Sequence, residues 1–117
     1  MHRLIQATLN SWNGLKNAAR SEQAVREELI VIALALVLAW FVGSTVIRSI
    51  ELIAVLLLLL VVEMLNTAIE KLSDRVNRDH DPQIGLVKDM GSAAVGITTL
   101  IAGFTWLAAL AERLGLI

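Results

Sequence analysis

The sequence has no cysteine, no tyrosine, one proline and few charged residues. Without cysteine, the chain cannot be a small secreted scaffold held by disulfides. Seven glycines and a single proline in 117 residues exclude collagen-like and low-complexity sequence. Charged residues make up 18% of the chain, against about 25% in an average soluble domain. The net charge of −1 gives no support for a nucleic-acid partner.

Apolar residues are abundant instead. They form 56% of the chain, and the mean hydropathy is +0.70. This content excludes a disordered chain. A small soluble domain buries little of its surface and needs polar residues to cover the rest, and this sequence lacks them. The composition therefore predicts a single integral-membrane domain over residues 1–117.

Three apolar runs contain most of this hydrophobicity: Leu29–Ile47, Leu52–Val62 and Met90–Ala111. A spanning helix needs roughly 20 apolar residues, and the first and third runs reach that length alone. The second does so only if the span starts near Ile50 and includes Glu63. The sequence thus predicts three transmembrane helices, at 28–47, at 50–70 with a cytoplasmic extension to about 78, and at 89–111.

Residues 1–21 differ from these runs. Their apolar side chains fall on one side of a helical wheel and their polar side chains on the other, which predicts an amphipathic helix lying in the membrane interface. The fold class expected is therefore an all-α membrane protein with one interfacial helix and three spans.

Basic residues predict the orientation of these spans. Four precede the first span and four lie between the second and third, whereas the first connection and the C-terminus carry one each. By the positive-inside rule, the N-terminus and the second connection face the cytoplasm and the C-terminus faces the other side.

A polar stripe marks the end of the second span. Glu63, Asn66, Glu70 and Asp74 are spaced three, four and four residues apart, so they share one helix face. A carboxylate at membrane depth is costly and is a functional candidate by default. Glu63 is the deeper acid and a candidate general base, whereas Glu70 lies where Mg²⁺ could reach it. The alternative is that these polar residues only form hydrogen bonds between helices. Helix packing, however, does not need a row of carboxylates such as this stripe.

Further candidates flank this stripe. We expect Lys88 and Asp89 to open the third helix, where the charge of Lys88 and the helix dipole would favour phosphate. The alternatives are that Lys88 is a membrane anchor and Asp89 an N-cap. Ser92 and Gly96 form a small-residue pair suited to close helix packing. No phosphate-binding loop, Rossmann fingerprint or protein-kinase signature is present, so a nucleotide would be held by side chains and a helix end.

Two segments of this sequence closely resemble the small prokaryotic diacylglycerol kinases: EMLNTAIEKLSDR, which begins at Glu63, and KDMGSAAV, which begins at Lys88. The segment SWNGL at Ser11, leading to Glu22 and to REE at Arg26, is also similar to this family. The resemblance covers nearly the whole chain. It implies a homotrimer of three-span subunits in the bacterial inner membrane, with a cytoplasmic N-terminus and a periplasmic C-terminus. It also implies transfer of the γ-phosphate of ATP to diacylglycerol, with Mg²⁺ as cofactor and phosphatidic acid as product.

The resemblance also implies residue roles. Glu63 would be the base that takes the proton of the lipid hydroxyl, supported by Asn66, and Glu22 and Glu70 would hold the metal. The nucleotide site would comprise Arg3, Asn10, Glu22, Glu70, Asp79, His80, Asp81, Lys88 and Asp89. The lipid site would comprise Arg3, Glu28, Glu63, Ser92 and Trp106. In the family the site is shared between neighbouring subunits, so the surface helix is expected to act on a neighbour.

Two alternatives stay open. A sister branch with the same catalytic signature phosphorylates undecaprenol, although the KDMGSAAV segment favours the diacylglycerol branch. Where relatives place aromatic residues near the nucleotide, this chain has Asn10 and His80.

A non-enzymatic alternative is a small proton-coupled transporter with one buried carboxylate. Such transporters need four spans and a carboxylate at mid-bilayer, whereas three spans with acids and Lys88 at one interface favour phosphoryl transfer.

Overall fold

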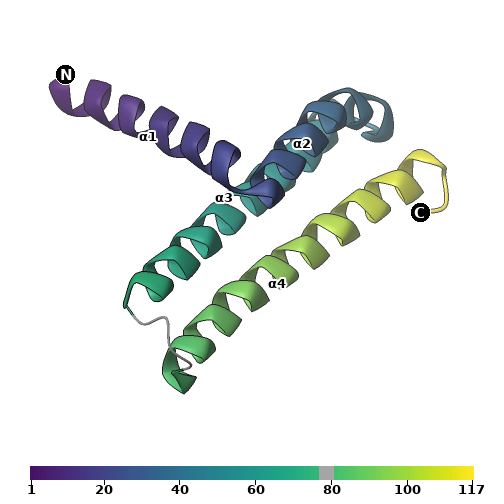
Figure 1. Ribbon diagram of the computed structural model, residues 1–117. Coiled ribbons are helices and arrows are strands. Elements are labelled where there is room, and N and C mark those ends of the chain that lie inside the picture. Colours follow the sequence, from purple (N-terminus) through teal and green to yellow (C-terminus); the bar gives the residue numbers. More distant parts are fainter. Residues whose placement is uncertain (77–80) are drawn as a thin grey trace.

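The computed structural model describes residues 1–76 and 81–117, and every regular element in these ranges is an α-helix (Figure 1). The helices are α1 (His2–Ser21), α2 (Gln23–Val42), α3 (Val46–Val76) and α4 (Pro82–Arg113). Helix α3 packs against both α2 and α4, whereas α1 contacts α2 and extends away from the other helices. The prediction of an all-α fold is confirmed.

A single extended residue separates α1 from α2. Glu22 has φ −120° and ψ 117°, so the helical hydrogen-bond pattern is interrupted there. The guanidinium of Arg26 donates hydrogen bonds to the carbonyl oxygens of Ala19 and Arg20, each at 3.0 Å. These carbonyls belong to the last turn of α1, which has no partners within its own helix. Arg26 therefore fixes the direction in which α1 leaves α2.

A tight turn separates α2 from α3. A Cβ on Gly43 would lie 2.7 Å from the backbone nitrogen of Ser49 and would overlap its hydroxyl oxygen. That hydroxyl donates a 2.7 Å hydrogen bond to the carbonyl oxygen of Ala39, which ties the two helices together. Helix α2 consequently ends at Val42, five residues before the end of the apolar run, and Ile47 already belongs to α3.

Helix α4 starts earlier than the sequence motif suggests. The carboxylate of Asp81 accepts hydrogen bonds from the backbone N–H groups of Gln83, at 2.8 Å, and Ile84, at 3.4 Å, and Pro82 occupies the first helical position. This is a standard helix start. Lys88 thus lies in the second turn, so the expectation that Lys88 opens this helix, with Asp89 as the alternative N-cap, is wrong.

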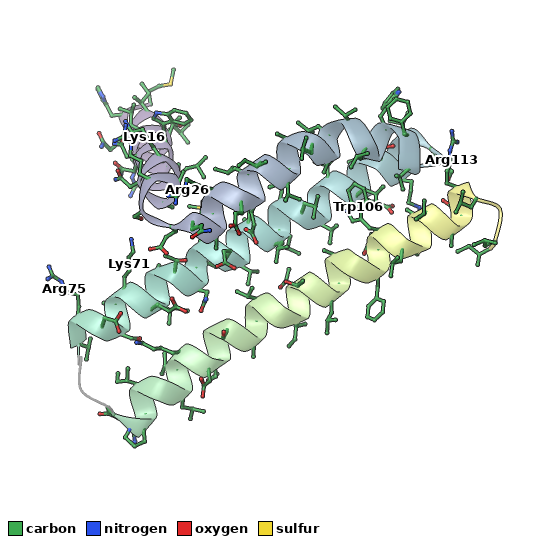
Figure 2. The ribbon with its side chains drawn as sticks, turned by 45° about the vertical axis from the view of Figure 1, so that its right-hand side comes forward. Lys16, Arg26, Lys71, Arg75, Trp106 and Arg113 are labelled. Carbon is green, nitrogen blue, oxygen red and sulfur yellow. The ribbon has the colours of Figure 1, made fainter. Side chains whose placement is uncertain are left out.

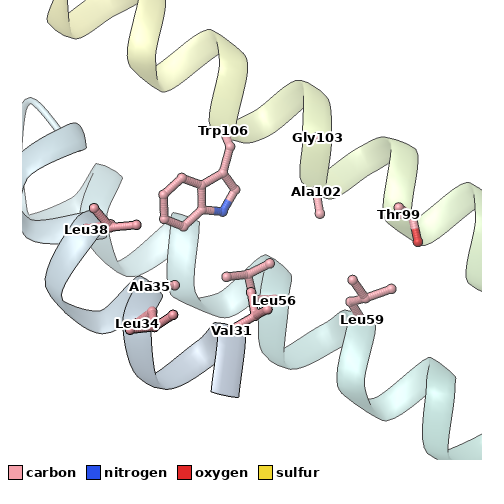
Figure 3. A pocket seen from close by; sticks show the side chains of 10 residues that line it. All are labelled: Val31, Leu34, Ala35, Leu38, Leu56, Leu59, Thr99, Ala102, Gly103 and Trp106. Atoms are coloured by element: carbon pink, nitrogen blue, oxygen red, sulfur yellow. The ribbon is translucent and has the colours of Figure 1, made fainter. Parts of the chain in front are cut away.

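Two alanines and one leucine form the contact among α2, α3 and α4. Ala39, Leu52 and Ala109, from α2, α3 and α4, are almost completely buried against one another. Trp106 projects from α4 toward α2 and α3, and its indole N–H donates a 3.2 Å hydrogen bond to the carbonyl oxygen of Leu52 (Figure 3). The same indole lines an apolar groove of about 450 Å³ between these helices.

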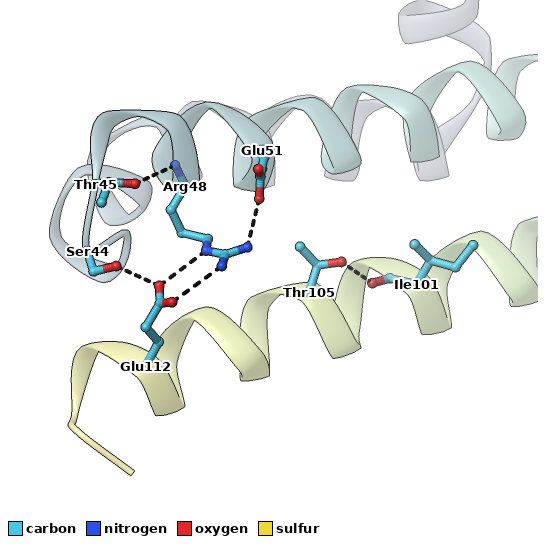
Figure 4. Close-up of polar contacts among 7 residues, drawn as sticks. All are labelled: Ser44, Thr45, Arg48, Glu51, Ile101, Thr105 and Glu112. Atoms are coloured by element: carbon cyan, nitrogen blue, oxygen red, sulfur yellow. Dashed lines mark hydrogen bonds and ion pairs between the residues drawn. The ribbon is translucent and has the colours of Figure 1, made fainter. Parts of the chain in front are cut away.

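A polar network fastens the end of the bundle opposite the α3–α4 connection (Figure 4). Glu112 of α4 accepts a 2.6 Å hydrogen bond from Ser44 in the α2–α3 turn and forms an ion pair with Arg48 at 3.2 Å. Arg48 also pairs with Glu51 at 2.8 Å. These side chains are partly exposed, so each bond is weak by itself. Together they connect the turn to the last turn of α4.

Helices α3 and α4 are long and apolar enough to cross a membrane. Helix α2 has 20 residues, but Arg26, Glu27 and Glu28 lie among its first six. Its uncharged part, from Leu29 to Val42, extends about 21 Å at 1.5 Å per residue, which is shorter than a hydrocarbon core of about 30 Å. Length and composition therefore mark two candidate spans among the described residues.

The helices leave a large apolar surface uncovered. A soluble monomer of 12.7 kDa would expose about 6,200 Å². This chain exposes 8594 Å², and large side chains such as Leu36, Phe41 and Phe104 are more than half exposed. Apolar surface of this extent needs lipid or other protein to cover it.

The turn at Gly43 generates the first prediction. We expect Gly43→Ala to lower the free energy of unfolding by about 1–3 kcal/mol, because the new methyl group meets the backbone of Ser49, which cannot turn aside. The measurement is reversible unfolding in mixed micelles, followed by helical circular dichroism. Gly85→Ala is the matched control, because nothing lies within 4 Å of its added Cβ. Equal stability of the two variants would contradict the steric argument.

Candidate active site

The polar stripe on α3 faces α4 and the α1–α2 junction. Glu63 is half-buried and Asn66 is buried, whereas Glu70 is exposed, so the stripe reaches solvent only at Glu70. The side-chain amide of Asn66 donates a 3.3 Å hydrogen bond to a carboxylate oxygen of Glu70. This bond orients the exposed carboxylate from a buried amide one turn away.

Two further carboxylates approach from the α1–α2 junction. Glu22 occupies the extended residue between the helices, and Glu28 lies in the second turn of α2. Glu63 lies near enough to Glu28, Glu22 and Glu70 for its carboxylate to feel their negative charge. We call Glu22, Glu28, Glu63 and Glu70 the acidic cluster. Their mutual repulsion makes this place attractive to a cation.

The close approach of α4 controls the position of Asn66. A Cβ on Gly91 would overlap the side-chain oxygen of Asn66 and would lie 3.3 Å from its Cγ. The bare backbone of α4 therefore covers the amide and directs its nitrogen toward Glu70. Gly91 was not among the expected site residues, although its place in the KDMGS segment pointed to it.

Lysines on α3 and α4 lie at the exposed end of the cluster. Lys71, on α3, donates a 3.0 Å hydrogen bond to the hydroxyl of Ser21 and pairs with Glu22 at 3.4 Å. In Figure 2 its side chain projects toward the α1–α2 junction. Lys88, on α4, forms an ion pair with Asp74 of α3. The sequence pattern gives no signal for Lys71 in the site, because only folding brings it next to Glu22.

The structure brings together five of the expected residues, which are Glu22, Glu28, Glu63, Asn66 and Glu70. Lys88 lies one turn beyond Glu70, at its pair with Asp74. Asp81 caps α4, and Asp89 and Ser92 are exposed on that helix. Asp79 and His80 lie outside the described residues.

Three expected residues lie elsewhere in the chain. Arg3 and Asn10 are exposed on α1, where Asn10 accepts a 3.1 Å hydrogen bond from Gln6. Trp106 contacts Leu52, which precedes Glu63 by 11 residues on α3, or about 16 Å along the helix. Trp106 is therefore at the depth of the apolar groove and not at that of the carboxylates.

The acidic cluster suits a magnesium ion bound together with phosphate. Within residues 1–76 and 81–117, no three His, Cys, Asp or Glu side chains gather closely enough to enclose a metal ion by themselves. Mg²⁺ does not need such a cage, because it usually takes one or two carboxylates and completes its shell with water and substrate phosphates. Glu22 and Glu70 provide such oxygens. The buried oxygens of Asn66 and Glu28 have no hydrogen-bond partner among the described residues.

The second prediction concerns the contact between α3 and α4. We expect Gly91→Ala to destabilise the fold by about 1–3 kcal/mol and to displace the amide of Asn66 from Glu70. Chemical unfolding in micelles measures the first effect, and the side-chain amide resonance of Asn66 reports the second. Gly96→Ala makes the same change on α4 where nothing lies within 4 Å. An undisturbed Asn66 resonance in Gly91→Ala would refute this account.

Comparison with known proteins identifies the family of this chain. The family profile for prokaryotic diacylglycerol kinase matches residues 9–110. The diacylglycerol kinase of Escherichia coli K12 is 39% identical over 113 residues, which cover 97% of this chain and 93% of that protein. The diacylglycerol kinase of Haemophilus influenzae is 38% identical over 103 residues, which cover 88% of this chain and 87% of that protein. The diacylglycerol kinase of Pseudomonas aeruginosa is 35% identical over 106 residues, which cover 91% of this chain and 86% of that protein. The chain belongs to the prokaryotic diacylglycerol kinase family.

Proposed function

We propose that this protein is a lipid kinase that transfers the γ-phosphate of ATP to the free hydroxyl of diacylglycerol and releases phosphatidic acid and ADP. Family membership supports the activity. The observation that carries the proposal is the acidic cluster, which extends from the half-buried Glu63 to the exposed Glu70. A lipid hydroxyl can approach such a site from the membrane and a nucleotide from water.

Glu63 acts as the general base in this proposal. It is the deepest acid of the stripe, next to the apolar part of α3, where the hydroxyl of a lipid would lie. Its carboxylate takes the hydroxyl proton as the lipid oxygen bonds to the γ-phosphorus and the bond to the β-phosphate oxygen breaks. Asn66 holds Glu70 through its amide. Phosphoryl transfer needs mainly such positioning and charge neutralisation.

Glu22 and Glu70 are the proposed magnesium ligands, with ATP providing the other charged partner. The ion supplies neutralisation of the phosphate charge when bound. Lys88 adds a cationic side chain near the same end of α3, and Asp79, His80, Asp81 and Asp89 would surround the nucleotide. Arg3 and Asn10 lie on α1, away from the cluster of their own chain, which supports a site completed by a neighbouring subunit.

A homotrimer in the bacterial inner membrane is the proposed assembly. The uncovered apolar surface supports burial in lipid and against other copies. We propose that the whole of α2, whose 20 residues extend about 30 Å, provides a third span, with its charged first turns at the cytoplasmic interface and the Gly43 turn at the periplasmic one. The distribution of basic residues supports a cytoplasmic N-terminus and a periplasmic C-terminus.

The lipid is proposed to lie along α2, α3 and α4. Glu28 and Ser92, with Arg3 of a neighbour, would be near the glycerol backbone. Trp106 lines the apolar groove, so we assign it to an acyl chain and not to the hydroxyl. Undecaprenol is the alternative acceptor, because the same base and metal ligands would serve any primary alcohol.

The third prediction separates the base from the metal ligand. Glu63→Gln should abolish transfer and leave the affinity for ATP with Mg²⁺ nearly unchanged, because Glu63 acts on the lipid. Glu70→Gln should lower both, because its carboxylate contacts the metal. Steady-state transfer in mixed micelles and calorimetric nucleotide binding are the measurements. Glu51→Gln makes the same change on α3 at the opposite end and should retain activity. The same nucleotide-binding defect in both variants would show that the roles are wrongly assigned.

The same assay identifies the acceptor. We expect the unmodified protein to phosphorylate diacylglycerol at least about tenfold faster than undecaprenol at equal mole fraction, a barrier difference of about 1.4 kcal/mol. Only diacylglycerol offers ester carbonyls for polar side chains near Glu63. Equal or faster turnover of undecaprenol would assign the protein to the sister branch.

The fourth prediction tests the three-span topology. Cysteines introduced at Asn17 and Gln83 should react with a membrane-impermeant reagent only from the cytoplasmic side, and one at Gly115 only from the periplasmic side. The measurement is labelling in intact and in permeabilised cells. Because the chain has no native cysteine, labelling of this protein reports only on the introduced cysteine. Cytoplasmic labelling at Gly115 would exclude a third span.

A further inference from the structure

Lys71 connects α3 to the junction between α1 and α2. Its ammonium group donates to the hydroxyl of Ser21, the last residue of α1, at 3.0 Å, and lies 3.4 Å from a carboxylate oxygen of Glu22. Both partners precede Lys71 by about fifty residues in the sequence. The lysine thus reaches across the fold to the extended residue between α1 and α2.

This contact places the positively charged ammonium group of Lys71 beside Glu22, a proposed magnesium ligand. The side chains of Lys71 and Glu22 are 57% and 33% exposed, so water screens their attraction and the pair opens readily. The hydrogen bond to Ser21 keeps the ammonium group beside Glu22 independently of that attraction. A divalent ion approaching Glu22 therefore meets a like charge beside that carboxylate.

We propose that Lys71 is an internal counter-ion of Glu22, which competes with the divalent cation for this carboxylate and so sets the affinity of the acidic cluster for the cation. The proposal rests on the proposed function only in its choice of Glu22 as a metal ligand. Lys71 neutralises part of the acidic cluster in the absence of the ion, and it must move away from Glu22 when the ion binds.

The fifth prediction is that Lys71→Met tightens cation binding. We expect the dissociation constant for Mn²⁺ alone to fall by about two- to fivefold, the range that an exposed ion pair provides. The full-length protein in micelles is titrated with Mn²⁺ without nucleotide or lipid, and free Mn²⁺ is measured by electron paramagnetic resonance. Lys71→Arg, which keeps the charge, should bind Mn²⁺ as the unmodified protein does.

Two controls give this test its specificity. Arg75→Met removes a positive charge four residues further along α3 and should leave the Mn²⁺ affinity unchanged. In the background of Glu22→Gln, which itself weakens Mn²⁺ binding, Lys71→Met should have no effect, because the group for which Lys71 competes is gone.

Several results would overturn the proposal: unchanged or weaker Mn²⁺ binding in Lys71→Met, equal tightening in Arg75→Met, or tightening that persists with Glu22→Gln. Absence of Mn²⁺ binding to the unmodified protein would also overturn it. These experiments measure Mn²⁺ binding and not phosphoryl transfer. They therefore test the role of Lys71 even if the protein shows no lipid-kinase activity. If Glu70→Gln weakens Mn²⁺ binding and Glu22→Gln does not, the metal site stands and the role of Lys71 is excluded.

Discussion

The structure depends on holding several carboxylates together at the border between apolar and polar surroundings. Glu63 lies half-buried at the end of the apolar part of α3, and burial of a charge there is costly. The lack of a side chain at Gly91 lets α4 approach Asn66 closely, and the long α3 helix carries the stripe from the apolar region into water. The remaining helices add the second pair of carboxylates or fix the far end of the bundle.

The break at Glu22 adds the second constraint. Because this residue is extended, its carboxylate is not confined to a helix face and can be directed toward α3. Arg26 holds the end of α1 through carbonyl oxygens, and Lys71 holds Glu22 itself from α3. One basic side chain thus determines the geometry of the junction, while the other determines the charge at the carboxylate.

The sequence predicted the helices well and their ends less well. Apolar runs and the spacing of the stripe predicted an all-helical chain with Glu63, Asn66 and Glu70 on one face, because helical periodicity depends only on local order. The end of α2 was misplaced because Gly43 is required by a contact with Ser49, which no local pattern encodes. The start of α4 differs from the expected one because the Asp81–Pro82 capping sequence begins the helix six residues before Lys88. Lys71 and Gly91 could not be assigned from spacing, since each acts on a residue from another helix.

Charge balance explains why the acidic cluster needs partners of two kinds. The acidic cluster has the ammonium group of Lys71 beside Glu22, whereas that of Lys88 is engaged by Asp74. A single positive charge neutralises only one acid, whereas a divalent ion carries enough charge for two. A fixed lysine stabilises the folded protein without the ion, at the expense of affinity for it. Lys71 therefore stabilises Glu22 in the absence of the divalent ion and weakens binding of the ion to Glu22. Because the contact between Lys71 and Glu22 is weak and exposed, Lys71 can move away when the ion binds.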